Sequence, residues 1–208
     1  MKLFNYDNVL CLSPHPDDVE YSMSGLIKKY PDTNFIILLL SNGSNFDETS
    51  GENRFNEVKK FWSLLEVDNI IILNINKKFD EIKDCEWINV IESKINSYKV
   101  DAIFGTSSED THYEHIITNR ILHSIGRNKK VSLFEYKSPS TKESWIPNFF
   151  IEIDKFYDSK VYSLINSFDS QLDSIYFTDK LIKLFNMNYN INKLGYDKIE
   201  SFKILRKL

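Results

Sequence analysis

The sequence Ser13-Pro14-His15-Pro16-Asp17-Asp18-Val19-Glu20 decides how the rest of the chain is interpreted. It follows an apolar run at residues 9–12 and precedes a segment, residues 19–30, whose apolar residues recur at helical spacing. A buried strand that ends in a polar, proline-stiffened turn and continues as a helix is typical of the first βα unit of an α/β sheet. Ligands in such sheets bind at the carboxyl ends of the strands. One imidazole and two carboxylates at this turn therefore indicate a divalent metal with a general base.

Short apolar segments alternate with helical ones along the chain, which predicts a mainly parallel sheet flanked by helices. The expected strands are 8–12, 34–40, 69–73, 101–105, 131–136 and 148–153. The expected helices are 19–29, 52–65, 87–98, 113–125 and 155–168, with parts of 172–185 and 197–205. We therefore expect an α/β, Rossmann-like fold, in which residues 1–208 form a single domain with an extra C-terminal strand and helices.

Composition excludes several function classes. The net charge of -4 gives no basic stripe for nucleic acid. No apolar run approaches the roughly 18 residues of a membrane span, and the N-terminal residues lack a signal-peptide pattern. The two cysteines, Cys11 and Cys85, have no paired spacing, so we interpret both as buried thiols in a reducing compartment. We expect a cytoplasmic protein with a small-molecule substrate, no nucleic-acid partner and no stable membrane insertion; whether it forms a homo-oligomer is open.

A second polar sequence, Asp110-Thr111-His112-Tyr113-Glu114-His115, follows the expected strand at 101–105. Three of the four histidines thus lie in two strand-end loops, and the fourth, His123, is interpreted as structural. An isolated His-x-Asp is more often a turn or a cap, and an isolated His-x-x-His at a helix start is more often a surface pair. The occurrence of both at matching strand ends favours a shared metal site instead.

These residues carry a resemblance to a known family. The sequence 15–20, followed by Ser24-Gly25, resembles the opening motif of the PIG-L/LmbE-like family of zinc-dependent N-deacetylases. Residues 112–115 stand where that family usually has His-Pro-Asp-His, and Glu200-Ser201-Phe202 resembles its C-terminal signature. Two departures are visible: Tyr113-Glu114 replaces Pro-Asp, and Ser24 replaces one of two usual glycines. Neither removes a proposed ligand.

The resemblance implies a role for each matching position. His15, Asp18 and His115 would be the metal ligands, with Zn²⁺ favoured and Fe²⁺ fitting the same set. Asp17 would be the general base and then the acid that protonates the leaving amine. His112 would stabilise the tetrahedral oxyanion.

Three other positions keep open alternatives. The resemblance places Arg54 near the sugar, but a surface salt bridge with Glu57 is an equal interpretation. Asp110 either accepts a hydrogen bond from a histidine ligand or caps the next helix. The polar loop 45–51 is a candidate for the rim of the site.

The leading hypothesis is a metal-dependent hydrolase that removes an N-acetyl or other acyl group from an N-acetylated amino sugar, such as a GlcNAc-type glycoside or a nucleotide sugar. The family resemblance implies this substrate class; the residues alone indicate a metal-dependent hydrolase on an α/β fold. One alternative is an amidase or esterase acting on a non-sugar substrate. Another is a catalytically inactive sugar- or nucleotide-binding protein. A dinucleotide-binding dehydrogenase is disfavoured because no Gly-x-Gly-x-x-Gly turn follows the first strand.

Overall fold

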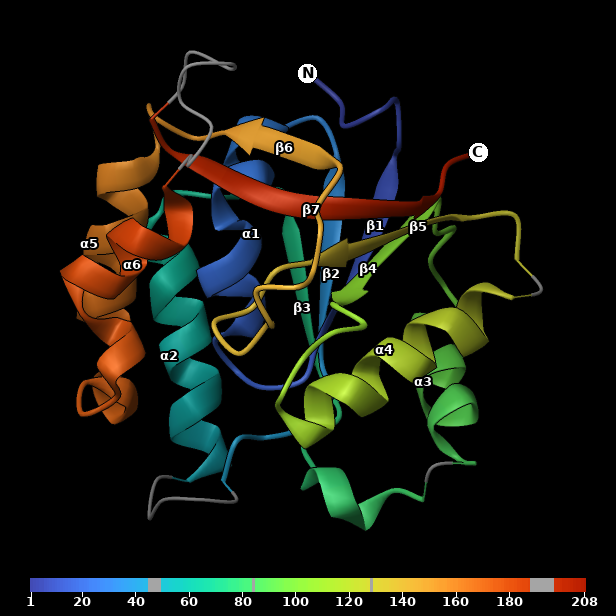
Figure 1. Ribbon diagram of the computed structural model, residues 1–208. Helices are drawn as coiled ribbons and strands as arrows, with labels where there is room; N and C mark the ends of the chain where they lie inside the picture. The colour runs from blue at the N-terminus through green and yellow to red at the C-terminus, as the bar shows by residue number, and fades with distance from the viewer. Residues whose placement is uncertain (45–49, 84, 128, 188–196) are drawn as a thin grey trace.

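A computed structural model of the chain describes residues 1–44, 50–83, 85–127, 129–187 and 197–208 (Figure 1). Within these residues the strands form one sheet in the order β3-β2-β1-β4-β5-β7-β6. Strands β1 to β5 pair in parallel, and β7 runs antiparallel between β5 and β6. The strands are β1 Asn8–Ser13, β2 Asn34–Leu39, β3 Ile70–Asn74, β4 Ala102–Thr106, β5 Ser132–Tyr136, β6 Phe149–Glu152 and β7 Ile199–Arg206.

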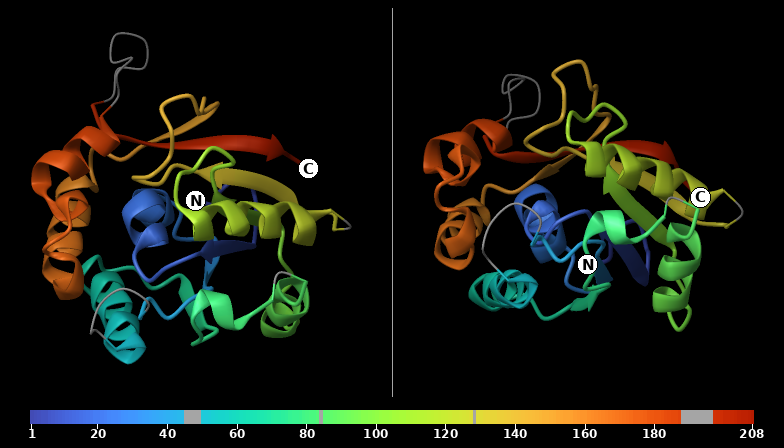
Figure 2. Two further views of the ribbon diagram at one scale, coloured as in Figure 1. Left: turned by 60° about the horizontal axis from the view of Figure 1, so that its bottom comes forward. Right: turned by 90° about the horizontal axis from the view of Figure 1, so that it is seen from below.

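Helices cover both faces of the sheet, as Figures 1 and 2 show. Helices α1 (Asp18–Lys29), α2 (Gly51–Leu64), α5 (Tyr157–Ser167) and α6 (Asp179–Asn186) lie on one face. Helices α3 (Trp87–Ile95) and α4 (Tyr113–Gly126) lie on the other. Short 3₁₀ turns occupy Phe79–Glu81 (η1), Asp169–Gln171 (η2) and Ile175–Phe177 (η3). No helix among the described residues is long and apolar enough to cross a membrane.

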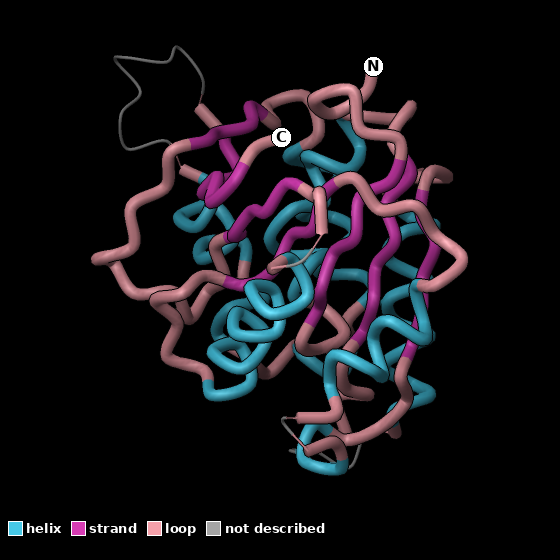
Figure 3. Tube along the Cα trace, turned by 90° about the vertical axis from the view of Figure 1, so that its right-hand side faces the viewer, coloured by secondary structure: helices cyan, strands magenta, loops and turns pink. Residues whose placement is uncertain are grey.

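The alternation of side chains along β1 explains why the core has two halves. Val9 and Cys11 belong to the apolar cluster beneath α1, α2 and α5, whereas Leu10 and Leu12 belong to the cluster beneath α3 and α4. All four side chains are fully buried. A strand buried on both faces needs a continuous apolar sequence, as in 9–12 and 34–40. The expected single-domain α/β architecture is therefore confirmed, and Figure 3 shows the strands side by side between the helices.

Two expectations are wrong. Residues 197–205, expected to be helical, contain most of strand β7, in which Phe202 pairs with both Tyr136 and Phe149. A helix here would leave the backbone N–H and C=O groups of β5 and β6 without these partners, which the local sequence does not reveal. Cys85 is exposed rather than buried, because the neighbouring Trp87 takes the buried position at the start of α3. Residues 45–49 of the candidate rim loop lie outside the described residues.

Strand β7 also supports a bend in α1. Backbone angles depart from helical values at Met23 (φ -142°), and the helix resumes at Ser24-Gly25. The Glu200 carboxylate accepts hydrogen bonds from the N–H groups of Gly25 (2.8 Å) and Leu26 (2.7 Å), thereby capping the resumed helix. A Cβ atom on Gly25 would lie 2.5 Å from Ile153 Cγ2, so only glycine fits here. The Lys160 ammonium pairs with Glu200 at 2.7 Å, and both side chains are fully buried.

We predict that Lys160→Met destabilises the fold by about 3–5 kcal/mol, because it leaves the buried Glu200 carboxylate without a counter-charge. Lys29→Met is the matched control: Lys29 pairs with Glu152 near the surface, and its loss should cost about 1 kcal/mol or less. Urea unfolding at pH 7 measures both free energies. Equal destabilisation by the two variants would contradict a special role for the buried pair.

Candidate active site

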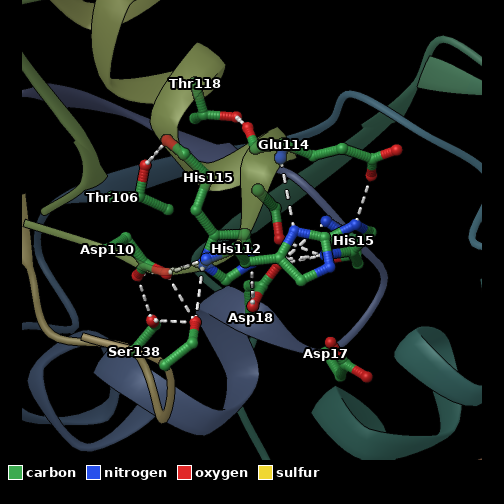
Figure 4. Close-up of polar contacts among 12 residues, drawn as sticks. His15, Asp17, Asp18, Thr106, Asp110, His112, Glu114, His115, Thr118 and Ser138 are labelled. Carbon is green, nitrogen blue, oxygen red and sulfur yellow. Dashed lines mark hydrogen bonds and ion pairs between the residues drawn. The ribbon is translucent and has the colours of Figure 1, made fainter. Parts of the chain in front are cut away.

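The two histidine-containing loops meet where the strand order reverses. From β1 the chain crosses to β2 on one side, and β4 is added later on the other side of β1. Ligand sites in open α/β sheets form at such a switch point, outside the carboxyl ends of the strands. Here a cavity of about 430 Å³ is lined by residues of both loops, including His15, Asp17, Asp18, His112 and His115. Figure 4 shows His15, Asp18, His112 and His115 converging from the two segments, with Asp17 to one side of them.

The first loop is held by short-range hydrogen bonds. Ser13 Oγ donates to the His15 carbonyl at 2.7 Å, and the His15 backbone N–H donates to Asp18 Oδ2 at 2.9 Å. The adjacent Asp17 has φ 150° and ψ -22°, a backbone conformation that non-glycine residues rarely adopt. Such strain persists only where the surroundings enforce it, and it is frequent at functional sites.

The second loop is organised by Asp110 and by the start of α4. Asp110 Oδ1 accepts a hydrogen bond from the His112 N–H at 2.9 Å. The His112 side chain then caps the helix, because its Nδ1 accepts from the Glu114 N–H at 3.3 Å. Thr106 Oγ1, at the end of β4, donates to the His115 carbonyl at 2.7 Å. These contacts fix His112 and His115 at the start of α4.

The three predicted metal ligands lie together. Asp18 lies between the imidazoles, with Oδ2 3.0 Å from His15 Nδ1 and Oδ1 3.3 Å from His115 Nε2. The two ring nitrogens are 3.4 Å apart. One donor atom from each of the three residues lies within 4.8 Å of the others. Two nitrogens and a carboxylate oxygen suit Zn²⁺ and leave coordination positions open, so the donor set fits the metal that the family resemblance implies.

In each of the two proposed histidine ligands, the ring nitrogen that is not the proposed metal donor faces a carboxylate. His115 Nδ1 is 3.2 Å from Asp110 Oδ2, and His15 Nε2 is in hydrogen-bond contact with Glu114 Oε2. Ser138 and Ser140 donate to Asp110 at 2.5 and 2.6 Å. Carboxylates in this position orient a metal-binding imidazole and increase its basicity. Of the two interpretations of Asp110, the contact with a histidine is therefore present, whereas the residue that caps α4 is His112, so the capping interpretation is wrong.

Sequence reasoning missed Glu114, Ser138 and Ser140. In the sequence Glu114 stands out only as a replacement within the His-x-x-His segment, and its contact with His15 spans 99 positions. Glu114 also belongs to a second candidate metal-binding group, with His15 and His112. The serines follow β5, and the strand-end rule that singled out the other two loops applies to them as well.

The cluster of carboxylates favours positive charge on the two histidines. Burial opposes protonation of His15, but Asp18 and Glu114 outweigh it and raise its pKa to about 9. Burial likewise opposes protonation of His115, whose pKa Asp18 and Asp110 raise to about 10. Burial alone would raise the pKa of Asp18, yet the two imidazoles hold it well below its ordinary value. Without a metal, the protonated imidazoles therefore carry the positive charge that a bound cation would otherwise supply.

Asp17 lies beside the cluster and is held by Arg54. An Arg54 terminal nitrogen donates to Asp17 Oδ2 and to the Pro16 carbonyl, both at 2.8 Å. The other terminal nitrogen donates to Ser170 Oγ at 2.6 Å and is 3.4 Å from Glu57. Arg54 and Glu57 are therefore a buried pair rather than a surface one, and Arg54 also lines the cavity. Burial raises the pKa of the Asp17 carboxyl above its ordinary value, against the opposing charge of Arg54.

His112 lies at the cavity with its ring in edge contact with His15, the centroids 4.8 Å apart. Burial and the nearby His15 and His115 lower the pKa of His112, which favours the neutral ring. Because Nδ1 accepts the Glu114 N–H, we assign the ring proton of neutral His112 to Nε2. The ring can therefore act as a hydrogen-bond donor.

The fold and the site together define a Rossmann-like α/β protein with a candidate metal centre at its switch point. Residues 10–125, more than half of the chain, match the family model described as "PIG-L: GlcNAc-PI de-N-acetylase". The chain belongs to this family. A search of curated proteins found no match.

Solved structures share the fold over nearly the whole chain. The conserved protein TT1542 from Thermus thermophilus has a TM-score of 0.77 at 22% identity, covering 98% of this chain and 96% of its own. The N,N'-diacetylchitobiose deacetylase from Pyrococcus horikoshii has a TM-score of 0.77 at 21% identity, covering 98% and 85%. GalB, the 4-carboxy-2-hydroxymuconate hydratase from Pseudomonas putida, has a TM-score of 0.72 at 14% identity, covering 100% and 98%. Because structures with different named activities share this fold, function must be argued from the site.

We predict that Asp110→Asn and Glu114→Gln each weaken metal binding about 10- to 100-fold, because each removes the carboxylate behind one imidazole. Glu109→Gln is the control, since it makes the same charge change one residue away on a side chain that bonds to Ser144. Competition with a chromogenic chelator measures the affinities. Unchanged affinity in both variants would show that these carboxylates do not support the metal ligands.

We also predict that metal binding releases protons and strengthens with rising pH. In the metal-free protein at pH 7 both His15 and His115 are protonated, because their pKa values of about 9 and about 10 lie above 7. A metal needs neutral imidazoles, so binding should release about two protons at pH 7 and fewer as the pH passes these pKa values. Calorimetric titration in buffers of different ionisation enthalpy counts the protons. Binding without proton release at pH 7 would contradict the charge state assigned here.

Proposed function

We propose that the protein is a zinc-dependent hydrolase that removes the N-acetyl group of an N-acetylated amino sugar. The observation that carries this proposal is the placement of the His15, Asp18 and His115 donor atoms beside the Asp17 carboxylate in one cavity. Membership of the PIG-L family supports the deacetylase chemistry. The P. horikoshii protein of the same fold, titled a chitobiose deacetylase, supports a sugar as substrate.

In this proposal His15, Asp18 and His115 hold the metal, and Fe²⁺ fits the same donors as Zn²⁺. When bound, the metal would supply Lewis-acid activation of water and of the amide carbonyl. Asp17 accepts the proton of the attacking water and returns it to the departing nitrogen, so that amide and water become amine and acetate. Its raised pKa suits both roles better than that of an exposed aspartate would. Arg54 fixes the carboxylate through its contact with Oδ2.

His112 would stabilise the negative charge that develops on the carbonyl oxygen. A neutral imidazole that donates from Nε2 can form a hydrogen bond to an oxyanion without bringing a second full charge into the site. The capping bond from the Glu114 N–H keeps the ring in place during the reaction. Arg54 also lines the cavity, so we retain it as a candidate contact for the sugar.

We predict that Asp17→Asn retains metal and loses about 10²- to 10⁴-fold in turnover, because it removes the proton acceptor and leaves the ligands in place. His15→Ala should lose the metal. His123→Ala is the matched control, since His123 lies on the exposed face of α4 and should keep both metal and activity. Metal content by mass spectrometry and primary-amine release from N-acetylglucosamine glycosides give the two measurements.

The outcomes separate the parts of the proposal. Full metal retention in His15→Ala would overturn the ligand assignment. Wild-type protein that binds metal but releases no amine from any glycoside would overturn the substrate class and favour an amidase or esterase acting on a non-sugar substrate. Equal amine release by wild type and Asp17→Asn would remove Asp17 from the mechanism.

A further inference from the structure

A second and larger cavity adjoins the metal cavity. Its volume is about 710 Å³, and it shares Tyr21, Pro139 and Tyr176 with the first cavity as a common wall. It lies between the loop that joins β5 to β6 (gold in Figure 1) and helix α6. Tyr21 Oη donates to the Tyr176 carbonyl at 3.0 Å, which fixes the turn η3 at this junction. A substrate that places its amide beside Asp17 therefore has a preformed space for the rest of the molecule.

Most of the side chains that line the second cavity are apolar and several are partly uncovered, and Lys137, Lys142 and Glu143 line it as well. Ile146 on the loop is 74% exposed, and Phe150 and Leu184 are each 38% exposed. Apolar side chains gathered in a concave surface are typical of ligand sites rather than of ordinary protein surface. This part of the site is suited to an apolar or aromatic group, and a sugar ring alone would leave it uncovered.

The same cavity contains a cation that lacks an ion-pair partner among the described residues. Lys137 lines the cavity, and its Nζ lies 4.8 Å from the centre of the Phe185 ring. Burial lowers the pKa of Lys137, and the charge of Glu143 opposes this shift, but no described carboxylate lies within ion-pair distance of Nζ. A half-buried ammonium among apolar groups favours an anion as its ligand.

We propose that the substrate is an amino-sugar glycoside whose aglycone is an apolar or aromatic group carrying one anionic substituent, a carboxylate or a phosphate, and that this aglycone binds in the second cavity against Ile146 and Lys137. The inference rests on the proposed function. A long N-acyl chain would fill the apolar part but has no charge for Lys137, which is why the aglycone is the better occupant.

The test uses N-acetylglucosamine glycosides with methyl, phenyl, 4-carboxyphenyl and 4-phosphonophenyl aglycones. We expect kcat/KM to rise about tenfold from methyl to phenyl, and about tenfold again when the phenyl ring carries an anion.

Lys137→Met should abolish only the second increase, since it keeps the unbranched apolar stem. Ile146→Ser should reduce only the first. Lys155→Met is the control, because it removes the same charge from an exposed lysine outside both cavities and should change neither ratio. The two anionic glycosides distinguish carboxylate from phosphate.

Affinities of the same glycosides for metal-free protein, measured by calorimetry, separate this inference from the proposed function. Turnover that is equal on all four glycosides overturns the inference and leaves the deacetylase proposal standing. Absence of turnover with the same order of affinities, lost in Lys137→Met, overturns the deacetylase proposal and supports the anion-binding cavity. A preference for N-octanoyl over N-acetyl methyl glycosides that Lys137→Met does not alter would assign the cavity to the acyl chain and overturn the inference.

Discussion

The Asp18 carboxylate is the group on which the site depends, because it is buried between two imidazoles from loops a hundred positions apart. Burying a carboxylate costs several kcal/mol unless a cation compensates it. Asp110 and Glu114 add two more carboxylates behind the same imidazoles. The raised pKa values of His15 and His115 favour the two imidazolium ions that compensate these carboxylates. A divalent ion held by the same residues would supply this compensation when the imidazoles are neutral, so protons and a metal would compete.

The sheet and its last strand place this carboxylate. The switch between β1 and β4 brings the two loops to one edge, whereas the position of Asp18 depends also on the first turn of α1. That helix bends at Met23 and resumes where Glu200 caps the N–H groups of Gly25 and Leu26. The bend separates the turn that carries Asp18 from the part of α1 that resumes at Ser24-Gly25, and both parts pack on the core. Strand β7, near the C-terminus, thus helps to fix the geometry of α1, near the N-terminus.

The parallel part of the fold could be predicted from sequence because each βα unit has a local pattern of its own. Strand β7 could not be predicted in this way, because residues 199–206 form a strand through hydrogen bonds to β5 and β6 and not through a periodic pattern of their own. The contacts of the site likewise include some that could be predicted from sequence and some that could not. Strand-end position was enough to predict that the two histidine-containing loops meet, whereas the choice of His15, Asp18 and His115 came from the family resemblance. The contact of Glu114 with His15 depends on side-chain length and on how α4 begins, and no spacing in the sequence encodes it.

The buried Arg54 holds the Asp17 carboxylate both directly and through the adjacent backbone carbonyl of Pro16. Its guanidinium binds the Pro16 carbonyl and the Asp17 side chain from one nitrogen, and Ser170, itself bonded to Glu57, from the other. A planar fork with fixed donor directions suits this task better than an ammonium. The strained φ of Asp17 lies between the two groups that Arg54 holds, so the same bonds that orient the carboxylate also stabilise its backbone. Asp17 is therefore held in one position, while burial keeps its pKa raised against the charge of Arg54.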